Sequence, residues 1–245
     1  MVKPSGNIPA GGYNNTFVII VAAGSGSRFG SDIPKQYLPL NGKPVLVHTI
    51  EAFRNAVPGA YICVVISESG RELWQEVAEE YGIDDIIVAL GGASRTESVH
   101  NAISALQGNF GANDIVMIHD GARPLVNCEM IRKVASAVSS GAEAVVPVLP
   151  LTEAIAEKKD CGVTPIDRAK FVTVQTPQAF NAALLAEAYN AVGDKPMPDD
   201  AAIYTEFTGR PLATVPGHPQ NIKITHPADI ELAGVHLSHP IPYSE

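Results

Sequence analysis

The stretch FVIIVAAGSGSRFG, Phe17–Gly30, joins a continuous run of apolar residues to a loop of small residues. The run up to Ala23 is rich in β-branched side chains, as expected of a parallel strand that is buried on both faces. The small residues of the loop allow backbone N–H groups to approach the oxygens of an anion. The stretch therefore predicts an α/β fold with an anion site at the end of its first strand.

Strand and helix patterns alternate along most of the chain after this stretch. The spacing predicts strands at 60–67, 85–90, 113–120, 142–150 and 212–216. It predicts helices at 43–53, 71–81, 94–106, 127–140, 181–191, 201–208 and 227–237. Ser94 and Glu97 form a capping-box pattern at the start of one helix, and Thr225 with Pro227 marks the start of the last. This alternation predicts a doubly wound, mostly parallel Rossmann-like sheet with helices on both faces.

The alternation is interrupted at 151–174, which is polar and contains a DCG turn candidate between two short alternating flanks. We interpret this segment as a projecting β-hairpin arm. Because an isolated two-stranded hairpin is marginal in water, the arm is expected to pack on a partner subunit. Residues 1–16, rich in Gly, Pro and Asn, are expected to form a flexible N-terminal segment, and 17–245 a single domain.

Composition narrows the class of protein. The chain has 245 residues, of which 46% are hydrophobic and 18% charged, as in soluble globular enzymes. Its formal net charge of −9 argues against nucleic-acid binding. The scattered Cys63, Cys128 and Cys161 are typical of a reduced intracellular protein. With no membrane-spanning run and no signal-peptide pattern, we expect no membrane association and a cytoplasmic location.

The glycine loop matches neither common nucleotide motif. Gly24, Gly26 and Gly30 are spaced one residue too widely for a dinucleotide fingerprint, and no Gly-Lys-Ser/Thr sequence follows for a P-loop. What remains is a loop with two positive charges, Arg28 and Lys35. Cations beside a phosphate cradle suit a reaction in which charge develops on departing pyrophosphate.

Five segments together resemble one family of nucleotidyltransferases. They are AAGSGSRFGSDIPKQYL (22–38), GGASRTESV (91–99), HDGARPLV (119–126), VQTPQAF (174–180) and NIKIT (221–225). All five occur in the order typical of the 2-C-methyl-D-erythritol 4-phosphate cytidylyltransferases. The resemblance covers residues 17 to about 237. It implies transfer of CMP from CTP to that polyol phosphate, with release of pyrophosphate, in the non-mevalonate isoprenoid pathway, and it implies Mg²⁺ or another divalent cation as cofactor.

The resemblance also assigns roles to residues. Arg28, Lys35 and Lys223 are expected to be catalytic, with Lys223 bridging the attacking phosphate and the α-phosphate. The expected nucleotide-binding residues are Ala22, Ala23, Gly24, Ser25, Gly26, Gly91, Gly92, Arg95 and Ser98. The expected substrate-binding residues are Asp120, Arg123, Thr152, Arg168, Thr176 and Thr225.

Several assignments leave alternatives open. Asp120, at the end of a predicted strand, either accepts hydrogen bonds from polyol hydroxyls or ligates the metal. Arg123 either contacts the substrate phosphate or pairs with Asp120. His119 is expected to be a buried neutral imidazole rather than a base, because the attacking phosphate is already ionised. Arg168, on the arm, matches a family arginine that reaches the neighbouring subunit's site, which implies a homodimer through the arm.

Two departures from the family pattern fall in the acceptor half of the site. Ala154 stands where the family usually has a substrate-binding threonine, and Thr152, two positions away on the same face of a strand, could substitute. Pro198 likewise replaces a common threonine, although Asp199 and Asp200 follow it.

Three other functions are therefore weighed. A ribitol-5-phosphate cytidylyltransferase would require only a different acceptor. A nicotinamide-dependent oxidoreductase would require a dinucleotide site, against which the glycine spacing and Arg28 argue. A silent nucleotide sensor would bind CTP without turnover, and would leave the shared presence of Arg28, Lys35 and Lys223 without a reason.

Overall fold

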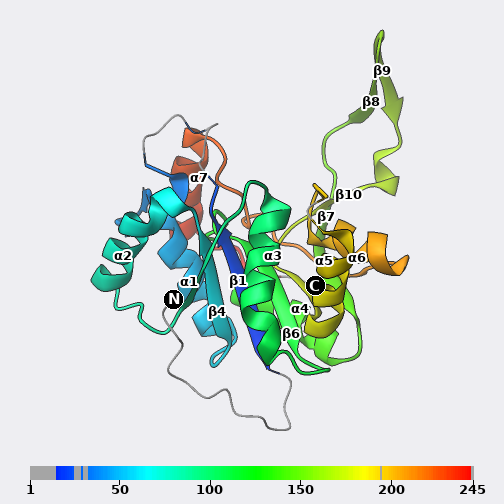
Figure 1. Ribbon diagram of the computed structural model, residues 1–245. Coiled ribbons are helices and arrows are strands. Elements are labelled where there is room, and N and C mark those ends of the chain that lie inside the picture. Colours follow the sequence, from blue (N-terminus) through cyan, green and yellow to red (C-terminus); the bar gives the residue numbers. More distant parts are fainter. Residues whose placement is uncertain (1–14, 25–28, 30–32, 194, 244–245) are drawn as a thin grey trace.

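The computed structural model describes residues 15–24, 29, 33–193 and 195–243. Within these residues the main sheet has eight strands, in the order β10-β7-β11-β6-β1-β4-β5, with β12 paired to β7 (Figure 1). The strands are β1 Thr16–Ala22, β4 Tyr61–Ile66, β5 Ile87–Leu90, β6 Ile115–Asp120, β7 Ala144–Pro150, β10 Val172–Val174, β11 Gln178–Asn181 and β12 Ala213–Pro216. Strands β10 and β11 run antiparallel to their neighbours and the other pairs are parallel, which confirms the mostly parallel sheet.

Helices cover both faces of this sheet. Their bounds are α1 Val45–Ala56, α2 Arg71–Glu80, α3 Arg95–Leu106, α4 Cys128–Ser139, α5 Ala182–Val192, α6 Asp200–Thr208 and α7 Pro227–Ser238. Helices α1, α2 and α4 pack on the face that carries Val18 and Ile20. Helices α3, α5 and α6 pack on the opposite face, which carries Phe17 and Ile19. Successive residues of β1 therefore point into two separate cores, which explains why its sequence is apolar throughout.

The chain reverses direction across the sheet at β1. It leaves β1 toward β4 and β5 on one side, then returns through α3 to β6 on the other side. A crevice forms where neighbouring crossovers leave a strand pair in opposite directions, just beyond the carboxyl ends of those strands. Ala22 ends β1 and Asp120 ends β6, so the fold brings the glycine loop and Asp120 to the same crevice.

The predicted arm is a hairpin that extends away from the main sheet (Figure 1). Strands β8 Ile155–Lys159 and β9 Gly162–Ile166 pair only with each other among the described residues, and Asp160 and Cys161 form the loop. The segment then passes through a short 3-10 helix, η4 Arg168–Lys170, and rejoins the main sheet as β10. The paired part of the arm is therefore shorter than the predicted 151–174.

Three local details differ from the sequence prediction. Strand β11 was not predicted, because three of its four residues fall in the VQTPQAF motif and the fourth, Asn181, was placed at the start of a predicted helix. At α3 the Ser94 hydroxyl accepts from the N–H of Glu97 as predicted, but the Glu97 carboxylate accepts from Ala93 and not from Ser94. Helix α7 begins at Pro227 as predicted, but the residue that caps it is His226 rather than Thr225. The Asp229 carboxylate accepts from the N–H groups of Thr225 and His226.

The remaining strands and 3-10 helices are two or three residues long. They are β2 Pro39–Leu40, β3 Lys43–Pro44 and the short 3-10 helices η1 Lys35–Tyr37, η2 Glu68–Gly70 and η3 Gln107–Asn109. In the part of the chain that the structure describes, no helix combines the length and the apolar character needed to span a membrane.

Candidate active site

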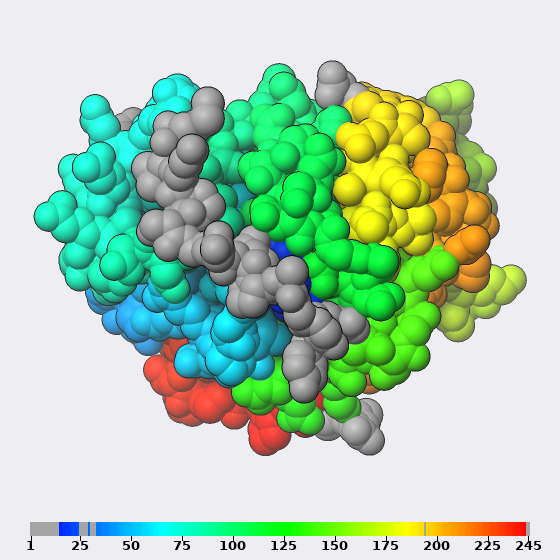
Figure 2. Space-filling view, turned by 60° about the horizontal axis from the view of Figure 1, so that its bottom comes forward, coloured from blue at the N-terminus to red at the C-terminus, as the bar shows by residue number. Residues whose placement is uncertain are grey.

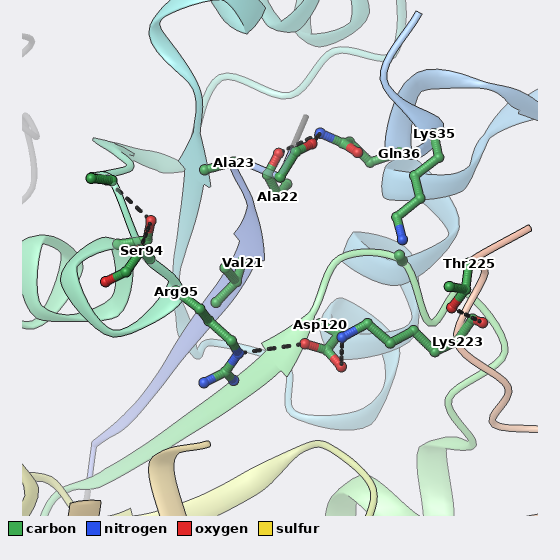
Figure 3. A pocket seen from close by; sticks show the side chains of 15 residues that line it. Val21, Ala22, Ala23, Lys35, Gln36, Ser94, Arg95, Asp120, Lys223 and Thr225 are labelled. Carbon is green, nitrogen blue, oxygen red and sulfur yellow. Dashed lines mark hydrogen bonds and ion pairs between the residues drawn. The ribbon is translucent and has the colours of Figure 1, made fainter. Parts of the chain in front are cut away.

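A cavity of about 550 Å³ occupies the crevice at the carboxyl ends of β1 and β6 (Figure 3). Most of the predicted site residues that the structure describes lie on its walls. The lining residues are Val21, Ala22, Ala23, Gly24, Lys35, Gln36, Gly92, Ala93, Ser94, Arg95, Ser98, Asp120, Ala122, Lys223 and Thr225. Four segments that are far apart in the sequence are thus brought together at one edge of the sheet.

Two glycines, Gly91 and Gly92, follow β5 where the α3 side of the cavity approaches the end of β1. A Cβ atom at Gly91 would lie 2.4 Å from Cβ of Ala23, and one at Gly92 would lie 2.2 Å from Cδ of Glu97. Both distances are far below a normal contact. The Cβ of Ala23 cannot move without its backbone, so a side chain at Gly91 would push the two segments apart, whereas the flexible Glu97 side chain could rotate away from one at Gly92. Gly91 is therefore needed for the packing of the cavity wall, in addition to any contact with a ligand.

Gln36 fixes the start of the glycine loop and was not predicted from the sequence. Its side-chain Nε2 donates to the carbonyl oxygens of Ala22 at 2.5 Å and Gly24 at 3.1 Å. Because Gln36 is 3% exposed and follows Lys35 in η1, these bonds also place Lys35 beside the loop. Gln36 lies within the 22–38 motif, but nothing in the sequence distinguished it from a solvated polar residue.

Asp120 is the centre of a cluster of three cations, of which Figure 3 shows Arg95 and Lys223. One carboxylate oxygen, Oδ2, lies 3.0 Å from Lys223 Nζ and 3.1 Å from Arg123 Nε, while Oδ1 lies 3.8 Å from Arg95 Nε. Burial raises the pKa of Asp120, but Lys223, Arg95 and Arg123 outweigh burial and hold this pKa well below its usual value. The cluster thus carries excess positive charge at the cavity wall.

Lys223 and Thr225 reach the cavity from the loop before α7. The Thr225 hydroxyl donates to the carbonyl oxygen of Lys223 at 3.1 Å, and the Thr225 N–H donates to Asp229 at 2.7 Å. Burial raises the pKa of Asp229, but backbone N–H groups and, to a smaller extent, Lys35 lower it overall. The Lys223 side chain is 40% exposed, so its ammonium group can approach a ligand in the cavity.

Arg95 contacts a second carboxylate outside the cavity. Its two terminal nitrogens lie 3.0 and 2.6 Å from the two oxygens of Asp200, which is fully buried. The Tyr189 hydroxyl donates to the same carboxylate at 2.5 Å. Neither Asp200 nor Tyr189 was predicted as a site residue, because their contact with Arg95 depends on how α5 and α6 pack against α3.

His119 and Thr176 lie directly behind Asp120. The Nε2 atom of His119 is 3.1 Å from the carbonyl oxygen of Arg123, and a carbonyl can only accept, so Nε2 carries the proton. The Nδ1 atom of His119 therefore accepts from the Thr176 hydroxyl at 3.0 Å, and the Thr176 oxygen accepts from the Asp120 N–H at 3.1 Å. This chain of hydrogen bonds fixes the turn that carries Asp120 and Arg123.

His119 is fully buried, and burial lowers its pKa to about 4. The expectation that it is a neutral imidazole agrees with this direction. Phe53 packs on it edge to face, with ring centroids 5.0 Å apart. Thr176 is 5% exposed and its single hydroxyl hydrogen points to His119, so its hydrogen bonds are directed into the protein rather than into the cavity.

The lowered pKa of His119 predicts a pH-dependent contribution to stability. The unfolded chain binds a proton near pH 6.5 and the folded chain only near pH 4, so this stability is present above about 6.5 and is lost as the pH falls toward about 4. The difference between the two pKa values corresponds to roughly 3 kcal/mol of unfolding free energy. We expect the difference in unfolding free energy between wild type and His119→Gln to shrink by about this amount over that range, measured by urea denaturation. A difference that stays constant with pH would contradict the prediction.

Some predicted residues lie elsewhere. Ser25, Gly26 and Arg28 fall outside the described residues. Arg123 lies behind Asp120 and also donates from Nη1 to the carbonyl oxygen of Asn221 at 2.8 Å. On the arm side, Arg168 and Thr152 are exposed and outside the lining of this subunit's cavity, and Arg168 donates to the carbonyl oxygen of Thr152. Ala154 and Pro198, the two departures from the family pattern, are also exposed and outside this lining.

The cavity offers few ligands for a metal ion. Among the described residues no group of three or more His, Cys, Asp or Glu could hold one. Asp120 is the only acidic residue among the described lining residues, and its oxygens contact cations. Mg²⁺ typically takes one or two carboxylates with substrate phosphates and water. The residues therefore fit a cation that is held mainly by the substrate, with Asp120 as the candidate protein ligand among the described lining residues.

Comparisons with known proteins agree with the geometry. The model of a family described as IspD, 2-C-methyl-D-erythritol 4-phosphate cytidylyltransferase, matches residues 16–239. A 2-C-methyl-D-erythritol 4-phosphate cytidylyltransferase of Bacteroides thetaiotaomicron is 38% identical, covering 90% of this chain and 98% of the relative. The protein of the same name from Phocaeicola vulgatus is 39% identical, covering 90% of this chain and 99% of the relative.

A solved structure supports the same assignment. The crystal structure of the Francisella tularensis 2-C-methyl-D-erythritol 4-phosphate cytidylyltransferase has a TM-score of 0.76 and 30% identity, covering 91% of this chain and 99% of that one. The motifs, the fold and the cavity at the carboxyl ends of β1 and β6 all agree with these comparisons. The chain belongs to the 2-C-methyl-D-erythritol 4-phosphate cytidylyltransferase family.

Proposed function

We propose that this enzyme transfers CMP from CTP to 2-C-methyl-D-erythritol 4-phosphate and releases pyrophosphate. The observation that carries the proposal is the convergence of Lys35, Arg95 and Lys223 on one cavity at the end of β1, where the described lining holds a single carboxylate. Two unit charges about 4 Å apart repel by about 4 kcal/mol at an effective dielectric of about 20. A phosphate dianion and a triphosphate can meet only where such repulsion is offset by cations.

The reaction needs no nucleophile from the protein. An oxygen of the acceptor phosphate forms a bond to the α-phosphorus of CTP while the bond from this phosphorus to the β-phosphate oxygen breaks, and pyrophosphate carries away the electron pair. The protein has to align the two phosphates and stabilise the charge that moves between them. Lys223 is suited to the bridging position because a lysine is a compact charge on a flexible stem. Lys35, and Arg28 by its place in the motif, are proposed to contact the phosphates of CTP.

A divalent cation is proposed as cofactor. When bound, it would neutralise part of the phosphate charge, with Asp120 as the candidate protein ligand. The backbone N–H groups of the glycine loop and of the segment after β5 are proposed to hold the nucleotide, since both segments line the cavity. Asp120 is also positioned to accept from polyol hydroxyls.

We further propose that the enzyme is a homodimer in which each arm supplies Arg168 to the neighbouring site. Large apolar side chains are exposed on the arm and at its base, with Val163 69%, Phe171 47% and Val172 53% exposed. Apolar surface of this kind is usual where another chain packs. We expect sedimentation equilibrium at micromolar concentration to give a dimer, and Phe171→Asp to shift it toward the monomer. A monomeric wild type would argue against Arg168 acting across subunits.

The experiment that tests the function supplies CTP and Mg²⁺ with one acceptor at a time and records pyrophosphate release. We expect turnover with 2-C-methyl-D-erythritol 4-phosphate and much less with ribitol 5-phosphate. The relatives described above carry the name of the first activity. Faster turnover with ribitol 5-phosphate would replace the proposed acceptor, and turnover with neither would refute the proposal.

A further inference from the structure

Arg95 is held at one edge by a carboxylate that no ligand can reach. Arg95 is the first residue of α3 and Asp200 is the first residue of α6. Both oxygens of Asp200 accept from the guanidinium, at 3.0 and 2.6 Å, in a bidentate pair. Asp200 is 0% exposed, whereas the Arg95 side chain is 27% exposed and lines the cavity. The pair therefore joins a buried anchor to a cavity residue.

The anchor is itself tightly held. The Tyr189 hydroxyl donates to Asp200 Oδ1 at 2.5 Å, and the start of α6 adds the partial positive charge of a helix N-terminus beside Asp200. Asp199 caps this helix and accepts from Gln178 at 2.9 Å, which connects the start of α6 to β11. Helices α3, α5 and α6 lie side by side on one face (Figure 2). Asp200 thus has a position that is fixed by the packing of several elements.

The other edge of Arg95 faces the cavity. Its Nε lies 3.8 Å from Oδ1 of Asp120, on the opposite side of Asp120 from Lys223 (Figure 3). A guanidinium has five N–H donors, of which the pair with Asp200 occupies two. Without Asp200, Asp120 would be the remaining carboxylate partner of Arg95 among the described residues, and a closer pair with it would move the guanidinium from its present place on the cavity wall. Asp200 prevents this by fixing the two terminal nitrogens.

We propose that Asp200, supported by Tyr189, is a positioning residue that orients Arg95 for CTP binding. The inference rests on the proposed function, because CTP is the ligand that Arg95 would meet. Asp200 does not touch the ligand and acts only through Arg95. Its effect on affinity must therefore disappear when Arg95 is absent, whereas a purely structural effect would persist.

The test measures CTP affinity by titration calorimetry, with no acceptor present, for wild type, Asp200→Asn, Arg95→Ala and the double variant. We expect Asp200→Asn to weaken CTP binding about tenfold, since hydrogen bonds to charged groups are worth about 1.5–3 kcal/mol. The double variant should bind CTP no more weakly than Arg95→Ala alone. Glu206→Gln, on the same helix but in an exposed pair with Lys195, is the matched control and should bind like wild type.

Three results would overturn the inference. They are wild-type affinity in Asp200→Asn, a further loss of affinity when Asp200→Asn is added to Arg95→Ala, and a wild type that does not bind CTP. If Asp200→Asn fails to fold, as judged by thermal melting, Tyr189→Phe takes its place in the cycle, with an expected loss of about threefold. Because binding is measured without turnover, a wild type that binds CTP but does not react would refute the proposed function while leaving this test intact.

Discussion

Replacing Lys223 by alanine is expected to lower kcat about 1,000-fold while changing CTP affinity only a fewfold. The ammonium group of Lys223 lies 3.0 Å from Asp120 on the cavity wall and is exposed enough to move to a ligand. In the proposed reaction it faces both phosphates, and one such charge pair near 4 Å contributes about 4 kcal/mol at an effective dielectric of about 20. That energy corresponds to about three decades in rate.

The measurement is steady-state pyrophosphate release together with CTP binding by calorimetry. Lys195→Ala removes an exposed lysine that pairs with Glu206 and serves as control, with activity unchanged. Lys223→Arg keeps the charge but not its compact shape, so it should recover only part of the rate. Equal losses in kcat and in CTP affinity for Lys223→Ala would show that the lysine only binds the nucleotide.

Much of the fold could be predicted because local patterns and tertiary packing agree. The buried run before Gly24, the helix start at Ser94 and the DCG turn at 160–162 each encode their structure within a few residues. Strand β11 could not be predicted, because its four residues form a strand only through their pairing with β6 and β7. Short segments of this kind take their structure from their neighbours.

The residues of the site also fall into two groups, those that could be predicted from the sequence and those that could not. Lys35, Asp120 and Lys223 lie in segments whose sequence is distinctive, and the structure places all three on one cavity. Asp200 lies outside the five motif segments, and Gln36, although it lies within one, is not distinguished there, since a carboxylate or an amide in a polar segment is usually solvated. Their roles follow only from burial and from their partners, Arg95 for Asp200 and the carbonyl oxygens of the glycine loop for Gln36. Residues that act through another residue are the hardest to find in a sequence.

Asp120→Asn is expected to lower kcat about 100-fold, because the carboxylate is the common partner of three cations. The variant keeps the size of the side chain but removes the negative charge that pairs with Lys223 and Arg123 and lies 3.8 Å from Arg95. These cations would then repel one another and lose the alignment that two phosphates require. Lys223 has the most exposed side chain of the three and should be displaced furthest.

A matched control separates this effect from a loss of stability. Asp114 precedes the same strand at its opposite end, is 4% exposed and accepts from the N–H groups of Asn15 and Gly111, both at 2.8 Å. Asp114→Asn should lower the midpoint of thermal unfolding but leave kcat unchanged at temperatures where the protein is folded. If Asp120→Asn also keeps its kcat, the carboxylate does not organise the cations. If its activity is restored by a higher Mg²⁺ concentration alone, Asp120 acts as a metal ligand rather than as the partner that aligns Lys223 with the phosphates.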